Sequence, residues 1–478
     1  MRIKIRLLAA MAICLSGFAG VAQNKWDLKR CVEYAVNNNI SVRQSDVQAR
    51  IYALTMRQNI LSQYPTLAFN GGLGVNSGRS QDPSNYSLIT TTYIANSFSL
   101  SSAVTIFNWY SKRNFIDGSR YDWLASLAST DKLRNDISLN VANAYLQVLL
   151  AIQQTSASEL QLHLSRSQLE NTQKQVMAGA LPELNAAELE SQLAQDSSSF
   201  ITTRASIDLA VLNLKAYMGL DAATVFEVDT PPLEKIPIED LANLQPEAIY
   251  SLALVNQPLQ KVDQLQLQSA RKYLAANRGA LYPSVSLSGS LGTNYVSQGQ
   301  EVNPASVYLR KDTIGQVTVG PTPYPVVSET YGYSLRKIPY FSQLNQNFGQ
   351  AVGLSVNVPI FNGGSLRISY EKSKLNLRNT ELQRDQDNLT LKQNIYQAYV
   401  NAVTAQQKFE ANKKTLAATQ KSFDFANKRY SVGMLNTIDL LTNQNNFYKA
   451  QIDLLYSQFD YVFKMKVLEF YKGLGLKM

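Results

Sequence analysis

Four segments of the chain alternate between apolar and small polar residues with a period of two: 66–76, 97–106, 284–291 and 347–360. This period over about ten residues predicts β-strands with one apolar face. It suits a transmembrane strand that faces lipid on one side and water on the other. The same alternation occurs in a half-buried strand of a soluble sheet, so the pattern alone leaves both interpretations open.

A second pattern has a period of seven and runs through two long stretches. The stretch Ser111 to Val176 has no proline and one glycine, Gly118, and the stretch Ser365 to Tyr430 has neither. At ~1.5 Å per residue each could form a helix of about 100 Å. Mostly apolar residues recur every seven positions in both stretches and in the segment after the second one: Val141, Val148, Thr155, Leu162, Leu169, Val176; Ile395, Ala402, Phe409, Leu416, Phe423, Tyr430; Leu441, Tyr448, Leu455, Val462. These heptads predict left-handed coiled-coil packing, which a soluble rod would also show.

Each long stretch ends in a short turn, 178–182 or 432–436, after which a returning helix is expected. Glycine stands where the chain must reverse, and a leucine follows two positions later. The residues are Gly179 and Leu181 in the first turn, and Gly433 and Leu435 in the second. We expect the leucines to be exposed at the tips, and an exposed apolar tip predicts a docking partner.

The chain is a two-fold internal repeat. Residues such as Tyr64 and Pro65 recur 218 positions later, and from residue 100 the matching offset becomes 254, so the second half carries 36 additional residues between about 293 and 346. The predicted organisation is a signal peptide over 1–22, a first repeat over 23–220, a proline-rich linker over 221–246 and a second repeat over 247–478. The segments 77–96 and 293–346 are expected to be loops that join the strands.

The N-terminus has the order of a secretory signal. Arg2, Lys4 and Arg6 form a basic head, the segment 7–18 is apolar, and small residues precede Gln23. An uncleaved anchor is the alternative, but the apolar run is shorter than the ~20 residues that span a bilayer. The sequence therefore predicts export without a helical anchor.

Composition excludes several kinds of site. The formal net charge is +9, spread without a basic block that would indicate nucleic-acid binding. His163 is the only histidine, and Cys14 and Cys31 are the only cysteines, the former inside the predicted signal. We therefore predict no catalytic, cofactor-binding or metal site, and no enzyme activity.

Four strands cannot close a barrel, and an open sheet edge cannot remain in lipid. The export signal and the scarcity of charge in the strands favour the membrane interpretation. Several copies of the chain are then expected to share one barrel.

The motifs, in their order along the chain, resemble those of the TolC-like outer-membrane efflux proteins. They are the opening Trp26-Asp27-Leu28 and the segment 31–39, the segment 359–364, and the segment 429–433 followed by Ile438-Asp439-Leu440-Leu441. The resemblance covers nearly the whole chain after the signal. The opening helix with Cys31, and Ala-Gln after the signal, resemble Bacteroidota members of the family.

This resemblance implies an α+β membrane protein that forms a homotrimer. Each copy would give four strands to a twelve-stranded barrel in outer-membrane lipid, and long antiparallel coiled-coil helices would form a periplasmic tunnel. The implied function is the exit duct of a tripartite efflux or type I secretion system, gated at its periplasmic end. The implied partners are a periplasmic adaptor protein and an inner-membrane transporter. A structural or adhesive coiled-coil surface protein is the alternative function.

The resemblance also implies gate residues near the helix turns. Tyr430 matches the family's latch tyrosine, although packing in the heptad stripe explains it equally well, and Asp439 matches an aspartate that rings the narrowest point. This sequence departs from the family at three positions, with Asn185 for an acid, Thr442 for a second ring aspartate and Leu435 for a latch arginine. A closed state is therefore expected to rely less on charge.

Overall fold

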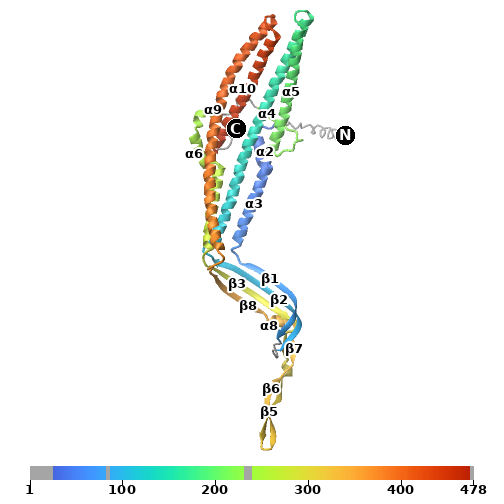
Figure 1. Cartoon of the computed structure of the whole chain (residues 1–478), viewed down its shortest axis with the longest axis vertical. Coiled ribbons are helices and arrows are strands. Elements are labelled where there is room, and N and C mark those ends of the chain that lie inside the picture. The colour runs from blue at the N-terminus through green and yellow to red at the C-terminus, as the bar shows by residue number, and fades with distance from the viewer. Residues whose placement is uncertain (1–24, 82–86, 231–238, 474–478) are drawn as a thin grey trace, which may run out of the picture. The chain divides into compact units, whose positions relative to one another are not determined.

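The computed structural model describes residues 25–81, 87–230 and 239–473 (Figure 1). The expected signal peptide and part of the expected linker lie outside these residues. The chain divides into two compact units, and each draws on both halves of the sequence. One, here called the helical unit, comprises the residues up to 54, 119–270 and those from 376; the other, the strand unit, comprises 55–118 and 271–375.

The strand unit contains a four-stranded antiparallel sheet in the order β1-β2-β3-β8. Its strands are β1 (Thr66–Gln81), β2 (Leu88–Phe107), β3 (Ser284–Val296) and β8 (Gly349–Asn357). All four strands predicted from the period-two pattern are therefore present. β1 and β8 form the two edges of this sheet.

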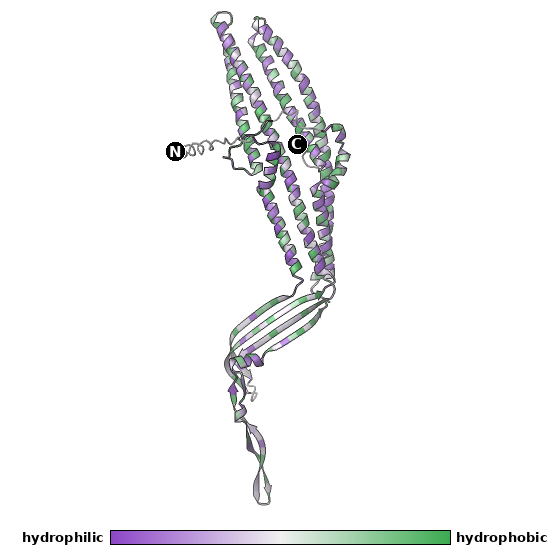
Figure 2. Ribbon diagram, turned by 180° about the vertical axis from the view of Figure 1, so that it is seen from behind, coloured by the Kyte–Doolittle hydropathy of each residue, from purple (hydrophilic) through white to green (hydrophobic). Residues whose placement is uncertain are grey.

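The strand register brings the predicted apolar positions to one face of the sheet. Phe69 pairs with Leu100, Leu100 with Leu291, and Leu287 with Leu354. Figure 2 shows the alternation of apolar and polar residues along these strands. The face is open in the single chain, with Leu73 76% and Val352 84% exposed. An apolar sheet face of this kind is what a barrel strand presents to lipid.

The two segments expected to be loops are largely strands. β1 and β2 extend to Gln81 and back to Leu88, so the connection between them is much shorter than 77–96. The insertion 293–346 holds β4 (Gln300–Val302), a 3-10 turn (Pro304–Ser306), β5 (Tyr308–Val319), β6 (Thr322–Gly332), β7 (Leu335–Lys337) and the short helix α8 (Tyr340–Gln346). β4 pairs with β7, and β5 with β6. Threonine, valine and tyrosine favour strands here despite the glycines and prolines.

The fourth predicted strand ends earlier than expected. β8 stops at Asn357, and Val358 to Ile360 are not in the sheet. Pro359 cannot donate a ladder hydrogen bond. Gly363 and Gly364 then turn the chain with φ of 66° and 78°, a left-handed conformation that glycine adopts readily.

The long helices are present as predicted. They are α4 (Ser111–Met177) and α9 (Ser365–Ser431), of 67 residues each, with the returning helices α5 (Glu183–Met218) and α10 (Thr437–Tyr471). The remaining helices are α2 (Leu28–Asn38), α3 (Ile40–Leu61), α6 (Pro246–Asn256) and α7 (Pro258–Gly279). Among the described helices, none has a stretch sufficiently long and apolar to span a bilayer.

Three apolar cores stabilise the helical unit. Around the middle of α4, Tyr145 is buried and donates a hydrogen bond to the carbonyl oxygen of Asp229 at 2.6 Å. Cys31 lies in the same core as a free thiol, and burial raises its pKa to about 12. A second core surrounds Ile395 and Leu468, and a third lies near the helix turns. All predicted heptad positions are buried or partly buried, which confirms their packing role. Those that belong to these three cores are Val141, Val148, Ile395, Ala402, Phe423 and Tyr430.

Candidate gate at the helix turns

Both helix turns reverse the chain at glycine. Gly179 and Gly433 each have φ of 72°, which a residue with a Cβ adopts only with strain. The N–H of Met434 donates to the carbonyl of Arg429 at 2.9 Å, and that of Ala180 to the carbonyl of Gln175 at 2.8 Å. These bonds satisfy carbonyls that the helix ends would otherwise leave free. The two tips are therefore structurally alike, as the repeat predicts.

The leucines at the tips are less exposed than expected. Leu181 and Leu435 are partly buried, and Leu435 packs against the core of Phe423, Ala426 and Leu440. The exposed apolar side chains are neighbours of these leucines: Met177 (79%), Leu184 (66%), Val432 (67%), Met434 (70%) and Ile438 (60%). Leu435 packs inward while the flanking residues are exposed, so the apolar surface at each tip consists mainly of these other residues.

Tyr430 joins the two helical hairpins, of which the first consists of α4 and α5 and the second of α9 and α10. Its ring packs against the core of Phe423, Ala426 and Leu440 near the second turn. Its hydroxyl lies 3.1 Å from the hydroxyl of Thr172 on α4. Tyr430 therefore packs within the heptad stripe and also makes a polar contact between α9 and α4.

Thr172 belongs to a stripe of polar residues on α4 that the sequence analysis did not identify. Successive members are three or four positions apart, which places them on one side of the helix. We call this stripe the polar seam; it comprises Ser158, Gln161, Ser165, Gln168 and Thr172. The serines and Thr172 are at most 2% exposed, and Gln161 is 5% exposed. Ser158, Ser165 and Thr172 are seven positions apart, and this spacing was the available signal in the sequence. Short polar residues on a helix, however, are also typical of a solvent-exposed face.

A buried carboxylate on α5 faces the seam. Asp196 is 7% exposed and accepts hydrogen bonds from Gln192 at 2.9 Å and from Gln161 at 3.4 Å. Ser165 donates to the same carboxylate. Farther from the turn, the hydroxyls of Ser158 and Thr203 lie 2.7 Å apart. Polar contacts therefore hold α4 to α5 over this region.

The seam also connects the first hairpin to the second. Gln444, which is fully buried on α10, donates to the hydroxyl of Ser165 at 3.2 Å. Gln192 on α5 and Asn445 on α10 exchange hydrogen bonds at 3.3 and 3.4 Å. Both amide atoms of Gln168 and Oε1 of Gln444 are buried and find no hydrogen-bond partner among the residues that the structure describes. Unpaired buried polar atoms weaken packing, so this interface is less cohesive than an apolar one.

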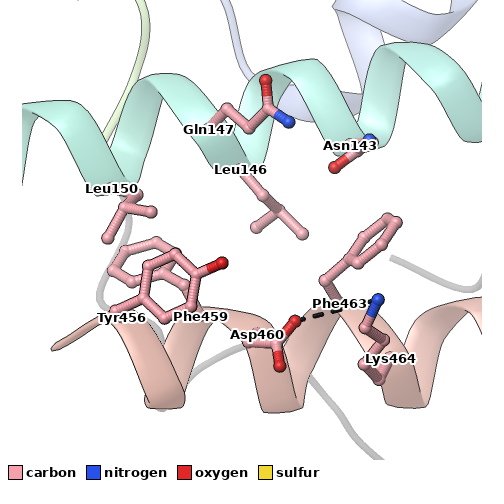
Figure 3. Close-up of a pocket in the computed structure, with 9 residues that line it drawn as sticks. All are labelled: Asn143, Leu146, Gln147, Leu150, Tyr456, Phe459, Asp460, Phe463 and Lys464. Carbon is pink, nitrogen blue, oxygen red and sulfur yellow. Dashed lines mark ion pairs between the residues drawn. The ribbon is translucent and has the colours of Figure 1, made fainter. Parts of the chain in front are cut away.

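The contact between α4 and α10 becomes apolar farther from the turns. A pocket of about 250 Å³ lies there, lined from α4 by Leu146 and Leu150 and from α10 by Phe459 and Phe463 (Figure 3). Its lining also includes the polar Asn143 and Gln147 from α4 and, from α10, Asp460 and Lys464, which form an ion pair at 3.9 Å. The same pair of helices thus changes from apolar to polar packing toward the turns.

The other predicted gate residues lie at the start of the returning helices. Asp439 is exposed in the first turn of α10, and Asn436 caps this helix by accepting from the N–H of Asp439 at 2.7 Å. Thr442 is exposed and donates to the carbonyl of Ile438 at 2.8 Å. Asn185 is partly buried near the start of α5. Within the described part of the chain, no ion pair involving Asp439 is found, so its carboxylate is available to solvent.

Comparisons with known proteins agree with this architecture. A family model described as "Outer membrane efflux protein" matches residues 32–220 and 249–462. The chain is 23% identical to outer membrane protein TolC of Salmonella enteritidis over 336 residues, which is 70% of this chain and 60% of that protein. It is 20% identical over 461 residues to a toluene efflux pump outer membrane protein, TtgC of Pseudomonas putida, covering 94% of this chain and 82% of that protein.

The fold also matches solved structures. The solved structure of CusC aligns with a TM-score of 0.75 and 16% identity, over 94% of this chain and 92% of that chain. The aligned part of the chain spans less than two thirds of the length of TolC. The fold is TolC-like, with long helices and short strands in two matching repeats. Because the family model matches most of the chain, the protein belongs to the outer membrane efflux protein family.

Proposed function

We propose that the protein is the exit duct of a tripartite efflux or type I secretion system, and that it acts without chemistry of its own. The observation that supports this most directly is the four-stranded sheet, whose apolar face is open and whose edges β1 and β8 are unpaired in the single chain. Unpaired edges are not tolerated in lipid. Copies of the chain must therefore complete the sheet, and a homotrimer would give twelve strands.

The family lies in the outer membrane with its helices in the periplasm. We propose that the tips of the helical hairpins contact a periplasmic adaptor protein and an inner-membrane transporter. The exposed Met177, Leu184, Val432, Met434 and Ile438 supply the apolar surface for this contact. Gly179 and Gly433 hold the turns that present them.

The gate in this proposal is the region between the tips and the polar seam. Tyr430 acts as a latch through Thr172, and three copies of Asp439 form a negative ring near the axis, with Thr442 and Asn185 as its neutral neighbours. The seam permits movement because hydrogen bonds between side chains can be exchanged, whereas an interlocked apolar core resists sliding.

Two finer proposals concern organisation and origin. The chain is proposed to be organised as a first repeat over 23–220, a proline-rich linker over 221–246 and a second repeat over 247–478, which the two ranges of the family model support. The opening helix with Cys31 supports a Bacteroidota-type member, which a phylogeny of full-length family members would test.

The test of the function is assembly followed by transport. Purified in detergent, the protein should run on unheated gels as a trimer that heating converts to monomer. Deletion of the gene should make cells more sensitive to toxic compounds. Crosslinking in cells should capture the adaptor and the transporter. A water-soluble rod with unchanged sensitivity would instead support the structural or adhesive alternative.

A further inference from the structure

The insertion in the second half forms a long hairpin with uncovered apolar surface. β5 and β6 pair with each other alone, outside the four-stranded sheet. Among their side chains, Ile314 is 69%, Val319 62% and Tyr324 54% exposed. An isolated two-stranded hairpin is at best marginally stable in water. Further contacts are therefore required to hold it.

A bulge divides the hairpin into two parts with different faces. The register shifts between Thr313 and Gly315. Beyond the shift, Gly315 pairs with Val326, Val317 with Tyr324, and Val319 with Thr322. Because alternate residues share a face, one face of this outer part is almost entirely apolar. We call it the distal apolar face; it comprises Val317, Val319, Tyr324 and Val326.

The opposite face of the outer part is built differently. It carries Gln316 and Thr318 from β5, which pair with Pro325 and Pro323 from β6. Prolines have no N–H, and in a paired strand they stand where the N–H would point away from the partner. The outer edge of β6 therefore lacks two donors and resists the addition of another strand. The distal apolar face therefore offers a surface for contacts that do not need a further strand on β6.

The charges near the base of the hairpin are paired within it. Lys311 and Glu329 form an ion pair at 3.2 Å, and Arg310 pairs with Asp312. Thr330 also donates to Asp312 at 2.9 Å. The segment 308–332 has no other charged residue, so its net charge is zero. Identical hairpins would not repel one another.

The position of the hairpin in the chain places it at a common end of the barrel strands. It lies between the end of β3 and the start of β8. The start of β3 follows α7, and the end of β8 precedes α9. With the helices in the periplasm, the hairpin is on the extracellular side. A twelve-stranded barrel with strands ~4.8 Å apart and tilted by ~40° has a radius of about 12 Å. The 11 residues of β6 extend about 37 Å at ~3.4 Å each, which exceeds this radius.

We propose that the distal apolar faces of three hairpins, one from each copy, pack against one another over the extracellular end of the barrel and form a cap. The occupant of each face is thus a second copy of the same segment. This inference rests on the proposed trimer. It accounts for the apolar face of the outer part of the insertion and for the edge of β6, which resists strand addition.

Cysteine crosslinking of the full-length protein tests the cap. In Val317→Cys trimers, oxidation or a short bismaleimide should join two of the three copies, so that a dimer band appears and the monomer band falls to about a third on a heated, non-reducing gel. Thr318→Cys is the matched control, because residue 318 is next to residue 317 but its side chain lies on the opposite face of the hairpin. The buried Cys31 is common to both variants and to the unmodified chain.

The same samples run without heating report the trimer independently. Intact trimers with equal crosslinking at both positions, or with none at Val317→Cys, would overturn the cap and leave the proposed duct standing. A crosslinked band that contains a different protein would also overturn it. Absence of trimers would contradict the proposed function itself.

A conductance measurement provides a second readout. Tyr324→Asp introduces charge into the packed faces and should raise the single-channel conductance of trimers in a bilayer, since the cap would separate. Thr318→Asp should leave the conductance unchanged. Equal conductance of Tyr324→Asp and the unmodified protein would contradict the cap.

Discussion

The hydroxyl oxygens of Tyr430 and Thr172 lie 3.1 Å apart and join the last turn of α9 to the last turns of α4. Thr172 is 2% exposed, so this hydrogen bond is largely protected from water. The ring of Tyr430 meanwhile packs against Phe423 and its neighbours. The sequence offered latching and packing as alternatives for Tyr430, and the structure contains the contacts for both.

The latch can be separated from the packing by a pair of substitutions. Tyr430→Phe keeps the ring and loses the hydroxyl, and Thr172→Val removes the partner, so each should weaken the contact by about 1 kcal/mol. Each should raise resting conductance in planar bilayers and sensitivity to large antibiotics. The double variant should be no more open than either single one, because the two residues share one interaction.

Packing alone would give a different pattern. Tyr430→Phe would then be silent, whereas Tyr430→Ala would destabilise the trimer by up to about 3–5 kcal/mol, the loss usual for a large buried aromatic side chain. Trimer content on unheated gels is the control for both readouts.

The buried carboxylate of Asp196 should set the stability of the polar seam. Asp196→Ala leaves the donors of Gln161, Gln192 and Ser165 without their acceptor, which is expected to cost about 1–3 kcal/mol for each donor that stays unpaired. Asp196→Asn keeps the shape and one acceptor and should cost less. Thermal unfolding of detergent-solubilised trimers measures the difference. Glu190→Ala, on the exposed side of α5, is the control, and an equal loss of stability in all three variants would contradict a role for the seam.

The sequence predicted features that depend on local periodicity and missed those that depend on tertiary contacts. The strands and the 67-residue helices follow from periods of two and seven. Burial of Ser165 or Thr172 could not be predicted, because a short polar side chain on a helix is usually solvated. The inward direction of Leu435 depends on the turn's conformation, which sequence spacing does not give.

The internal repeat extends to the turns that precede the two 67-residue helices. Gly363 and Gly364 correspond under the 254 offset to Trp109 and Tyr110, which also adopt positive φ, of 51° and 58°. The turn is thus retained in both halves, although two aromatic residues make it in the first. Trp109 packs on Tyr282 with ring centroids 5.1 Å apart, and such contacts offset the strain of the left-handed backbone.

Stability should depend on pH through Asp263 on α7. Burial, followed by the nearby carboxylate of Asp387 on α9, raises the pKa of Asp263 to about 6, and Arg384 opposes this shift. A folded-state pKa above the unfolded value means that the folded protein binds the proton more tightly. The contribution of Asp263 to stability should therefore be fully present below pH ~4 and be lost as the pH rises through about 6, by about 2–3 kcal/mol per chain.

Thermal unfolding of trimers at pH 5 and pH 7.5 measures this dependence. Asp263→Asn should flatten the profile by removing the titrating group, and Asp387→Asn should flatten it in part by removing the repulsive neighbour. Asp424→Asn, an exposed position on α9, should retain the slope of the unmodified protein. A steep profile in Asp263→Asn would assign the titration to another group.

The docking surface at the tips should depend on the outward-facing residues. Met434→Asp and Leu184→Asp place charge on side chains that are 70% and 66% exposed and should abolish efflux and adaptor crosslinking while trimers still assemble. Gly433→Asp should also abolish efflux, but through strain at φ 72°. Leu435→Asp should instead reduce trimer stability, because Leu435 packs inward. Normal efflux in both Met434→Asp and Leu184→Asp would contradict docking at the tips.

Asp439 should bind cations at the periplasmic end of the trimer. In a trimer, three exposed carboxylates near the axis would create a negative potential that concentrates cations in a narrow water-filled pore. Trivalent cations added from the periplasmic side should therefore block single-channel current, and high salt should weaken the block by screening. Thr442 supplies no second charge, so the block should be weaker than in a ring with two acids per chain.

Asp439→Asn removes three charges per trimer and should relieve most of the block. The variant should fold normally, because Asn436 caps α10 through the backbone N–H of residue 439, which the substitution retains. Loss of the carboxylate from the first turn costs only about 0.3–1 kcal/mol through the helix dipole. Glu410 is an exposed acid on α9, well away from the helix turn. Glu410→Gln is the matched control and should leave the block unchanged. If Asp439→Asn is blocked as strongly as the unmodified channel, the cation site lies elsewhere and Asp439 has no part in the gate.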